Sequence, residues 1–142
     1  MSTSIRSIVE DRVTAYLANQ ISGVTIHKGI TNEIRVLPAI IAYAEGSLKP
    51  SSLGAGNYGN YRVTLKVYIY SSADDETLET HRERVSKVHG LLTDSAALKA
   101  FWGTQNGKVY EIWIENDEEG MSQRRYGNSI TFTLMCVLPA QV

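Results

Sequence analysis

Residues 61–70 constrain the fold more than any other stretch, because they alternate between apolar and more polar side chains without a break. A period of two is typical of a β-strand that buries one face. The apolar face carries Val63, Leu65, Val67 and Ile69, and the other face carries Arg62, Thr64, Lys66, Tyr68 and Tyr70. The chain is therefore predicted to build a sheet around this strand, with a second layer against its apolar face.

The period changes directly after this strand, between Ser71 and Glu76. A Ser hydroxyl can cap the first free amides of a helix, and the carboxylates of residues 74–76 complement the positive end of the helix dipole. A helix is therefore predicted to begin here. Its apolar residues recur at three- and four-residue spacing, joined by His81 or Arg82 at the intermediate turn. They are Leu78, Val85, Val88 and Leu92.

Two more helices are predicted. Residues 96–102 form a short one that Thr93, Asp94 or Ser95 can cap and that Gly103 can end. Near the N-terminus, Ser2, Thr3 or Ser4 can cap an amphipathic helix. Its apolar positions are Ile5, Ile8, Val9, Val13, Tyr16 and Leu17.

Four other segments have strand-like patterns. Residues 24–27 are short and β-branched, and residues 37–44 are apolar on both faces, with Pro38 expected at the strand start or on an unpaired edge. Residues 109–115 alternate. Residues 129–138 alternate and become apolar on both faces at their far end, as expected for a strand that is covered on both sides.

Two loops are candidate contact sites. Residues 45–60 are rich in Gly, Ser and Pro and are predicted to form a long hairpin tip; loops of this length usually act on something. Gly54, Asn57 and Tyr58 are its candidate contact residues. Residues 116–120 are predicted to be the loop joining the last two strands, and the candidate contact residues there are Asp117, Glu118 and Glu119.

These elements predict an α+β fold: one domain over residues 1–142, with a mostly antiparallel sheet of four to five strands. The sheet packs against an N-terminal helix and a central helix followed by a short helix. Hydrophobic residues make up 43% and charged residues 20%, which is ordinary for a globular protein. Without a long apolar run or a secretory signal, synthesis and folding in the cytoplasm are expected.

A net charge of −1 provides no overall attraction to nucleic acid. No catalytic, cofactor or metal site is predicted. The glycines of residues 54–59 lack the following Lys-Ser or Lys-Thr of a phosphate loop and lead into a strand. His81 and His89 are about 12 Å apart along a helix, too far to share a metal, and are interpreted as surface or interface histidines. Cys136 is expected to be a buried structural thiol.

Exposed aromatic residues are the feature that these patterns leave unexplained. Tyr68 and Tyr70 occupy the outer face of the central strand, and Trp113 lies across from the apolar face of its own strand. Helices covering both sides of the sheet could absorb them. Tyrosine and tryptophan are also enriched at protein interfaces, so Tyr68 and Tyr70 are candidate residues of a subunit or tube interface.

The layout as a whole resembles the tail-terminator and tail-completion proteins of long-tailed bacteriophages. The likeness lies in the order of elements, in the strand 61–71 running into residues 74–92, and in the closing strand 129–134 preceded by Arg125. It contains no invariant chemical motif.

The resemblance implies a structural virion protein without a cofactor and not an enzyme. Such a subunit forms a hexameric ring on the head-proximal end of the tail tube, stops tube growth and joins the head. Its partners would be copies of itself, the tube protein and the head-tail connector proteins. DNA would pass through without sequence-specific binding, and a near-neutral subunit with an acidic tip at residues 117–119 suits such a passage. The alternatives are another connector or stopper subunit, or a cellular α+β enzyme or ligand-binding domain.

Overall fold

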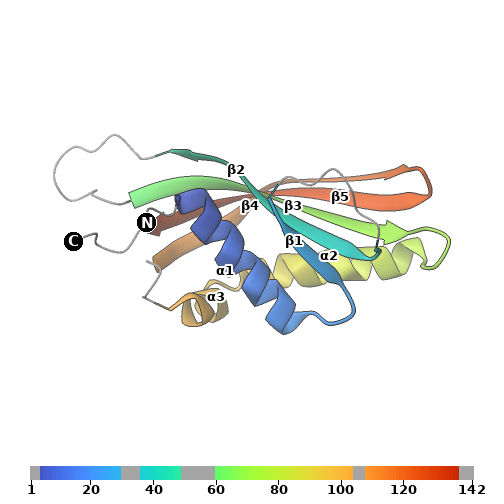
Figure 1. Cartoon of the computed structure of the whole chain (residues 1–142), viewed down its shortest axis with the longest axis horizontal. Coiled ribbons are helices and arrows are strands. Elements are labelled where there is room, and N and C mark those ends of the chain that lie inside the picture. Colours follow the sequence, from blue (N-terminus) through green and yellow to red (C-terminus); the bar gives the residue numbers. More distant parts are fainter. Residues whose placement is uncertain (1–3, 30–35, 49–59, 104–107, 138–142) are drawn as a thin grey trace.

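The computed structural model describes residues 4–29, 36–48, 60–103 and 108–137 (Figure 1). Within these residues the order of elements is the predicted one. The elements are α1 (Ile5–Gln20), β1 (Thr25–Lys28), β2 (Ala39–Leu48), β3 (Asn60–Ser72), α2 (Leu78–Thr93), α3 (Ser95–Trp102), β4 (Lys108–Ser122) and β5 (Arg125–Val137). The strands form one sheet in the order β1-β2-β3-β5-β4. Only the pairing of β1 with β2 is parallel among the described strands, so the predicted α+β class with a mostly antiparallel sheet is confirmed.

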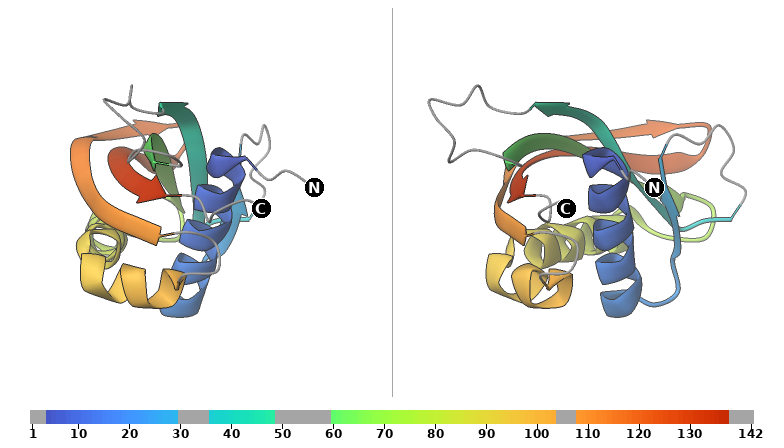
Figure 2. Two further views of the ribbon diagram at one scale, coloured as in Figure 1. Left: turned by 90° about the vertical axis from the view of Figure 1, so that its left-hand side faces the viewer. Right: turned by 60° about the vertical axis from the view of Figure 1, so that its left-hand side comes forward.

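The helices lie together on one face of a strongly twisted sheet, and the β4–β5 hairpin runs over α2 (Figures 1 and 2). The apolar face of β3 is buried against them as predicted. Its four apolar residues Val63, Leu65, Val67 and Ile69 are all 0% exposed and belong to the same core cluster as the apolar stripes of α1 and α2. The idea that helices cover both faces is wrong for the described helices, so the outer face of the sheet depends on its own side chains for cover.

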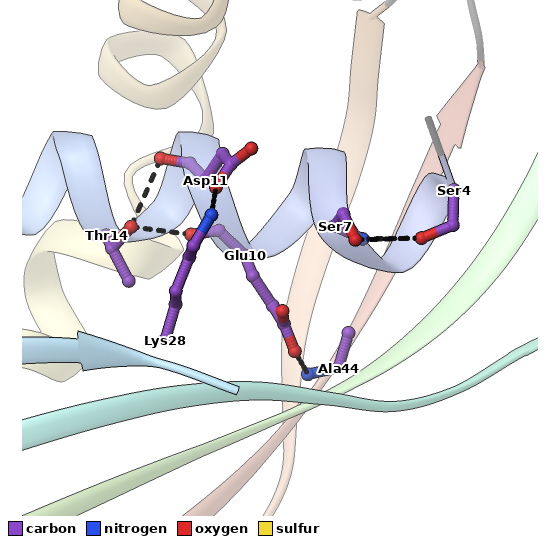
Figure 3. A network of polar contacts seen from close by, with 7 residues as sticks. All are labelled: Ser4, Ser7, Glu10, Asp11, Thr14, Lys28 and Ala44. Carbon is purple, nitrogen blue, oxygen red and sulfur yellow. Dashed lines mark hydrogen bonds and ion pairs between the residues drawn. The ribbon is translucent and has the colours of Figure 1, made fainter. Parts of the chain in front are cut away.

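Polar contacts fix α1 to the sheet (Figure 3). Ser4 caps the helix by accepting a hydrogen bond from the Ser7 amide at 3.1 Å. Glu10 accepts one from the backbone amide of Ala44 on β2 at 2.8 Å, and Asp11 forms an ion pair with Lys28 of β1. Two residues earlier on the same edge of β2, the Ala42 carbonyl accepts from the Gly29 amide just after β1, so the carboxylate satisfies an amide of β2 that lies beyond the end of β1.

The start of α2 differs from the prediction. Ser71 and Ser72 still belong to β3, and the N-cap is Thr77, which accepts a hydrogen bond from the Thr80 amide at 3.1 Å. The Ser71 hydroxyl is buried and bonded within the core, so it cannot cap a helix. The acidic residues 74–76 lie in the connecting turn. The predicted caps of α3 are confirmed, with Asp94 as N-cap and Gly103 as C-cap.

The second predicted loop, residues 116–120, is wrong because these residues continue β4. The chain instead reverses at Gln123 and Arg124, which both have positive φ angles, 52° and 60°. Two positive φ angles suit the twist of a tight hairpin, but Asn and Gly are the residues that usually signal such a turn. The sequence therefore carried no turn signal at the true reversal.

The first predicted loop is partly wrong. Residues 45–48 belong to β2, which pairs with β3 as far as Leu48 and Arg62, and Asn60 is already the first residue of β3. Gly54, Asn57 and Tyr58 lie outside the described residues.

A bulge also corrects the predicted faces of β4. The register shifts between Val109 and Glu111, so Val109 and Ile112 both reach the core, 4% and 6% exposed, although the alternation predicted for residues 109–115 places them on opposite faces. Tyr110 is the extra residue of the bulge and is 52% exposed. None of the described helices is both long and apolar enough to cross a membrane.

Candidate interaction surface

The two tyrosines on the outer face of β3 form one aromatic wall. The rings of Tyr68 and Tyr70 are 7° from parallel, with centroids 6.4 Å apart. Gly127 on β5 pairs with Tyr70, and a Cβ atom added to Gly127 would lie 3.3 Å from the Tyr70 ring. The missing side chain therefore makes room for this ring. The pKa of Tyr70 is raised, chiefly by burial and also by Tyr68, against an opposing effect of Arg125.

Both tyrosines are partly buried within the chain itself. Ile41 of β2 pairs directly with Tyr68 and is only 5% exposed, although it lies on the face that no described helix covers. Directly paired residues of an antiparallel ladder share a face, so the tyrosine shields the isoleucine. Tyr68 and Tyr70 thus stabilise the sheet and still border a surface pocket.

That pocket, defined here as the tyrosine pocket, has a volume of about 600 Å³. Its wall is the tyrosine pair, and its floor crosses β5 and β4 at Gly127 and Gly120, which pair with each other. Met121 at its edge is 63% exposed. Glu118 and Glu119 also line it. The structure therefore brings together the two tyrosines and two of the three acidic residues that the sequence analysis had placed in separate candidate sites.

The acidic run is divided between the two faces of β4. Glu119 faces α2 and accepts two hydrogen bonds from the Arg82 guanidinium, each 2.9 Å long. Asp117 also faces α2, with its Oδ2 2.9 Å from His89 Nε2. Glu118 lies on the outer face, where it accepts a hydrogen bond from Asn116. Two of these acidic residues therefore dock the hairpin on α2, and the interpretation of the run as a free acidic loop is wrong.

The pair between Arg82 and Glu119 should give the fold a pH dependence. The hydrogen bond from Arg82 is the main cause that lowers the pKa of Glu119; desolvation opposes it, and the charge of Arg82 adds to the lowering. Because the folded pKa lies below the unfolded one, the stabilisation is present above the unfolded pKa and is lost as pH falls through the folded pKa. Both groups are exposed, so the effect should be small.

We expect Arg82→Ala to lower the melting temperature slightly at pH 7 and by less at pH 2.5, because the stabilisation is lost as Glu119 becomes protonated. Thermal melts of both proteins across this range measure the difference. Lys87→Ala, at an exposed position of the same helix, is the control. An equal loss at both pH values would show that Arg82 stabilises through packing.

A chain of polar side chains runs through the core between α2 and the hairpin. Arg84 donates to the Ser71 hydroxyl at 2.7 Å, and Ser71 Oγ is 2.7 Å from His81 Nδ1. On the other side of the ring, His81 Nε2 is 2.7 Å from Asn128 Oδ1, and Asn128 donates to Asp117 at 2.8 Å. Since the amide oxygen can only accept, Nε2 carries the proton and Nδ1 accepts from the serine. The hydrogen bonds therefore run in one direction, from the Arg84 guanidinium to the Asp117 carboxylate.

This arrangement of serine, histidine and asparagine has the residue types of a hydrolase site but not its geometry. Ser71 and His81 are both 0% exposed, and the serine hydroxyl is already bonded to Arg84 and His81. A nucleophile needs access to a substrate, which this one lacks. The interpretation of His81 as a surface or interface residue is wrong. Its position in the apolar stripe of α2, four residues before Val85, was the signal for its burial.

The other candidates for chemistry are also structural. Cys136 is 1% exposed, and burial raises its pKa to about 12, so the thiol stays protonated at neutral pH. Within the described ranges no group of three or more His, Cys, Asp or Glu side chains could hold a metal ion.

Comparison with known proteins adds a structural likeness. No protein-family model matches this sequence, and no curated protein matches it. The fold is similar to that of a chain in a solved structure described as the virion of a native gene transfer agent particle, with a TM-score of 0.56. The match covers 88% of this chain and 84% of that chain at 9% sequence identity. At this identity the likeness concerns the fold alone.

Proposed function

We propose that this protein is a structural virion subunit of the tail-terminator type, and not an enzyme. The observation that carries the proposal is the fold match over 88% of this chain and 84% of a chain from a gene transfer agent virion. The order of elements that resembles tail terminators supports it. In this proposal residues 1–142 act as one domain, and copies of the chain form a hexameric ring on the head-proximal end of the tail tube. The ring stops tube growth, contacts the tube protein and the head-tail connector proteins, and lets DNA pass.

The tyrosine pocket provides the subunit with a contact surface. Its aromatic wall and the exposed Met121 are the residue types that dominate the centres of protein interfaces. The buried polar chain supports the same role in a different way, because it fixes the β4–β5 hairpin on α2 and so holds the pocket floor rigidly against its wall. A rigid surface loses less entropy when it binds.

Negative-stain imaging of the purified protein mixed with preformed tail tubes tests the proposal. Density that caps one end of the tube supports termination. Binding only to heads that contain a portal would identify the chain as a connector or stopper instead. Binding to neither would overturn the virion role and favour the cellular alternative.

A double variant tests whether the tyrosines contribute to the contact. We expect Tyr68→Thr with Tyr70→Thr to leave a folded but less stable subunit that no longer caps tubes. Each lost aromatic anchor weakens association roughly thirtyfold, and a ring repeats the loss at every contact. Sedimentation with tubes, beside circular dichroism of the variant alone, measures both effects. Tyr110→Thr removes an exposed tyrosine from the β4 bulge and is the matched control. Normal capping by the double variant would show that these tyrosines serve only the subunit itself.

A further inference from the structure

The floor of the tyrosine pocket is a shelf of bare backbone. Gly120 and Gly127 face each other across β4 and β5, and a Cβ atom added to Gly120 would have no heavy atom within 4 Å. Neither glycine is in the left-handed region of φ, so the backbone conformation does not require glycine at Gly120. The Tyr70 ring covers Gly127, and Gly120 leaves open space beside the parallel rings of Tyr68 and Tyr70.

The charges at the rim favour a cationic occupant. Among the described residues, Glu118 accepts only from Asn116, at 3.2 Å, and has no cation within ion-pair distance. The nearby Lys66 is already paired with Glu45 at 3.1 Å. The lining includes Glu118, Glu119 and one arginine, Arg125, which already has a partner of its own. Since Glu119 is bound by Arg82, Glu118 is the carboxylate that can accept a new partner.

An arginine side chain matches these features better than a lysine does. A guanidinium is planar, stacks on aromatic rings and can bind a carboxylate through two parallel hydrogen bonds, whereas an ammonium is a strongly hydrated point charge. Its three-carbon stem can lie in the open space at Gly120, against the apolar side chain of Met121. We infer that the tyrosine pocket is a receptor for an arginine side chain of a partner protein, stacked on Tyr68 and Tyr70 and paired with Glu118. The identification of the partner as another virion protein rests on the proposed function. The arginine-binding chemistry of the pocket is independent of that function.

Titration of the full-length protein with Nα-acetyl-arginine amide, followed by NMR, tests the inference. A ligand of this size should bind with a Kd on the order of 1 mM and shift the ring resonances of both tyrosines. Nα-acetyl-citrulline amide has nearly the same shape without the charge and is expected to bind at least tenfold more weakly, because the charge-assisted pair is lost. Equal binding of the two ligands would overturn the cationic assignment, and no shift at roughly ten times the expected Kd would overturn the receptor itself.

Two variants locate the site. Glu118→Gln should weaken arginine binding about tenfold and leave citrulline binding unchanged. Gly120→Val should abolish binding of both by filling the shelf, and it should keep or slightly raise the melting temperature, because valine favours a strand and the added Cβ meets no atom. Undiminished arginine binding to either variant would place the site elsewhere. These titrations use the isolated protein, so arginine can bind even if the protein does not cap tubes, and tubes can be capped even if arginine does not bind. The two proposals can therefore be refuted separately.

Discussion

Replacing Val88 by aspartate is expected to unfold the protein at ordinary temperatures. Val88 is 0% exposed and lies on the stripe of α2 that packs in the core under the sheet. An unpaired carboxylate buried there costs several kcal/mol, and the total stability of a domain of this size is only about 5–15 kcal/mol. The variant should therefore lose most of the cooperative melting transition seen by circular dichroism.

Lys87→Asp provides the matched control, because it introduces the same side chain at the neighbouring, exposed position of α2. It should change the free energy of unfolding by less than about 1 kcal/mol. A soluble Val88→Asp protein with an unchanged melting temperature would contradict the packing of α2 against the sheet.

His81→Ala is expected to lower the free energy of unfolding by about 3 kcal/mol, the second largest effect. The substitution leaves a cavity where a fully buried ring was, and it removes the partner of both the Ser71 hydroxyl and the Asn128 amide oxygen. A buried polar group without a partner costs more than its hydrogen bond contributed. Urea denaturation measures the change, and Glu83→Ala at an exposed position of α2 should shift it by less than about 0.5 kcal/mol.

A double-mutant cycle separates the hydrogen bond from the cavity. If His81 and Asn128 act through their mutual bond, the losses caused by His81→Ala and Asn128→Ala should fall short of additivity by about 1 kcal/mol in the double variant. Additive losses would mean that the bond between His81 and Asn128 contributes nothing to stability. Because Asn128 lies on β5 and pairs with Glu119 of β4, weakening this bond should also loosen the hairpin that forms the pocket floor.

Sequence patterns predicted the candidate surface only in separate parts. Tyr68 and Tyr70 stood out because they alternate with a buried face, and Glu118 because it sits in an acidic run. Nothing in the sequence indicated that they meet, since the meeting depends on β5 lying between β3 and β4 and on Gly120 pairing with Gly127. The proposed arginine receptor depends on the register between strands, and local sequence patterns do not determine that register.

Local physics by itself determined the central strand, its buried face, the order of elements and the caps of α3 at Asp94 and Gly103. These features depend on side-chain period and on hydrogen bonds within a few residues, so the sequence contains them directly. Tertiary structure decided the end of β4. The local sequence of residues 116–120 is typical of a solvated loop, and these residues continue the strand because Arg82 of α2 binds Glu119. The bulges of β4 likewise depend on its pairing with β5. The burial of His81 follows the same rule, because the polar partners that make it tolerable come from β3 and β5, far away in the sequence.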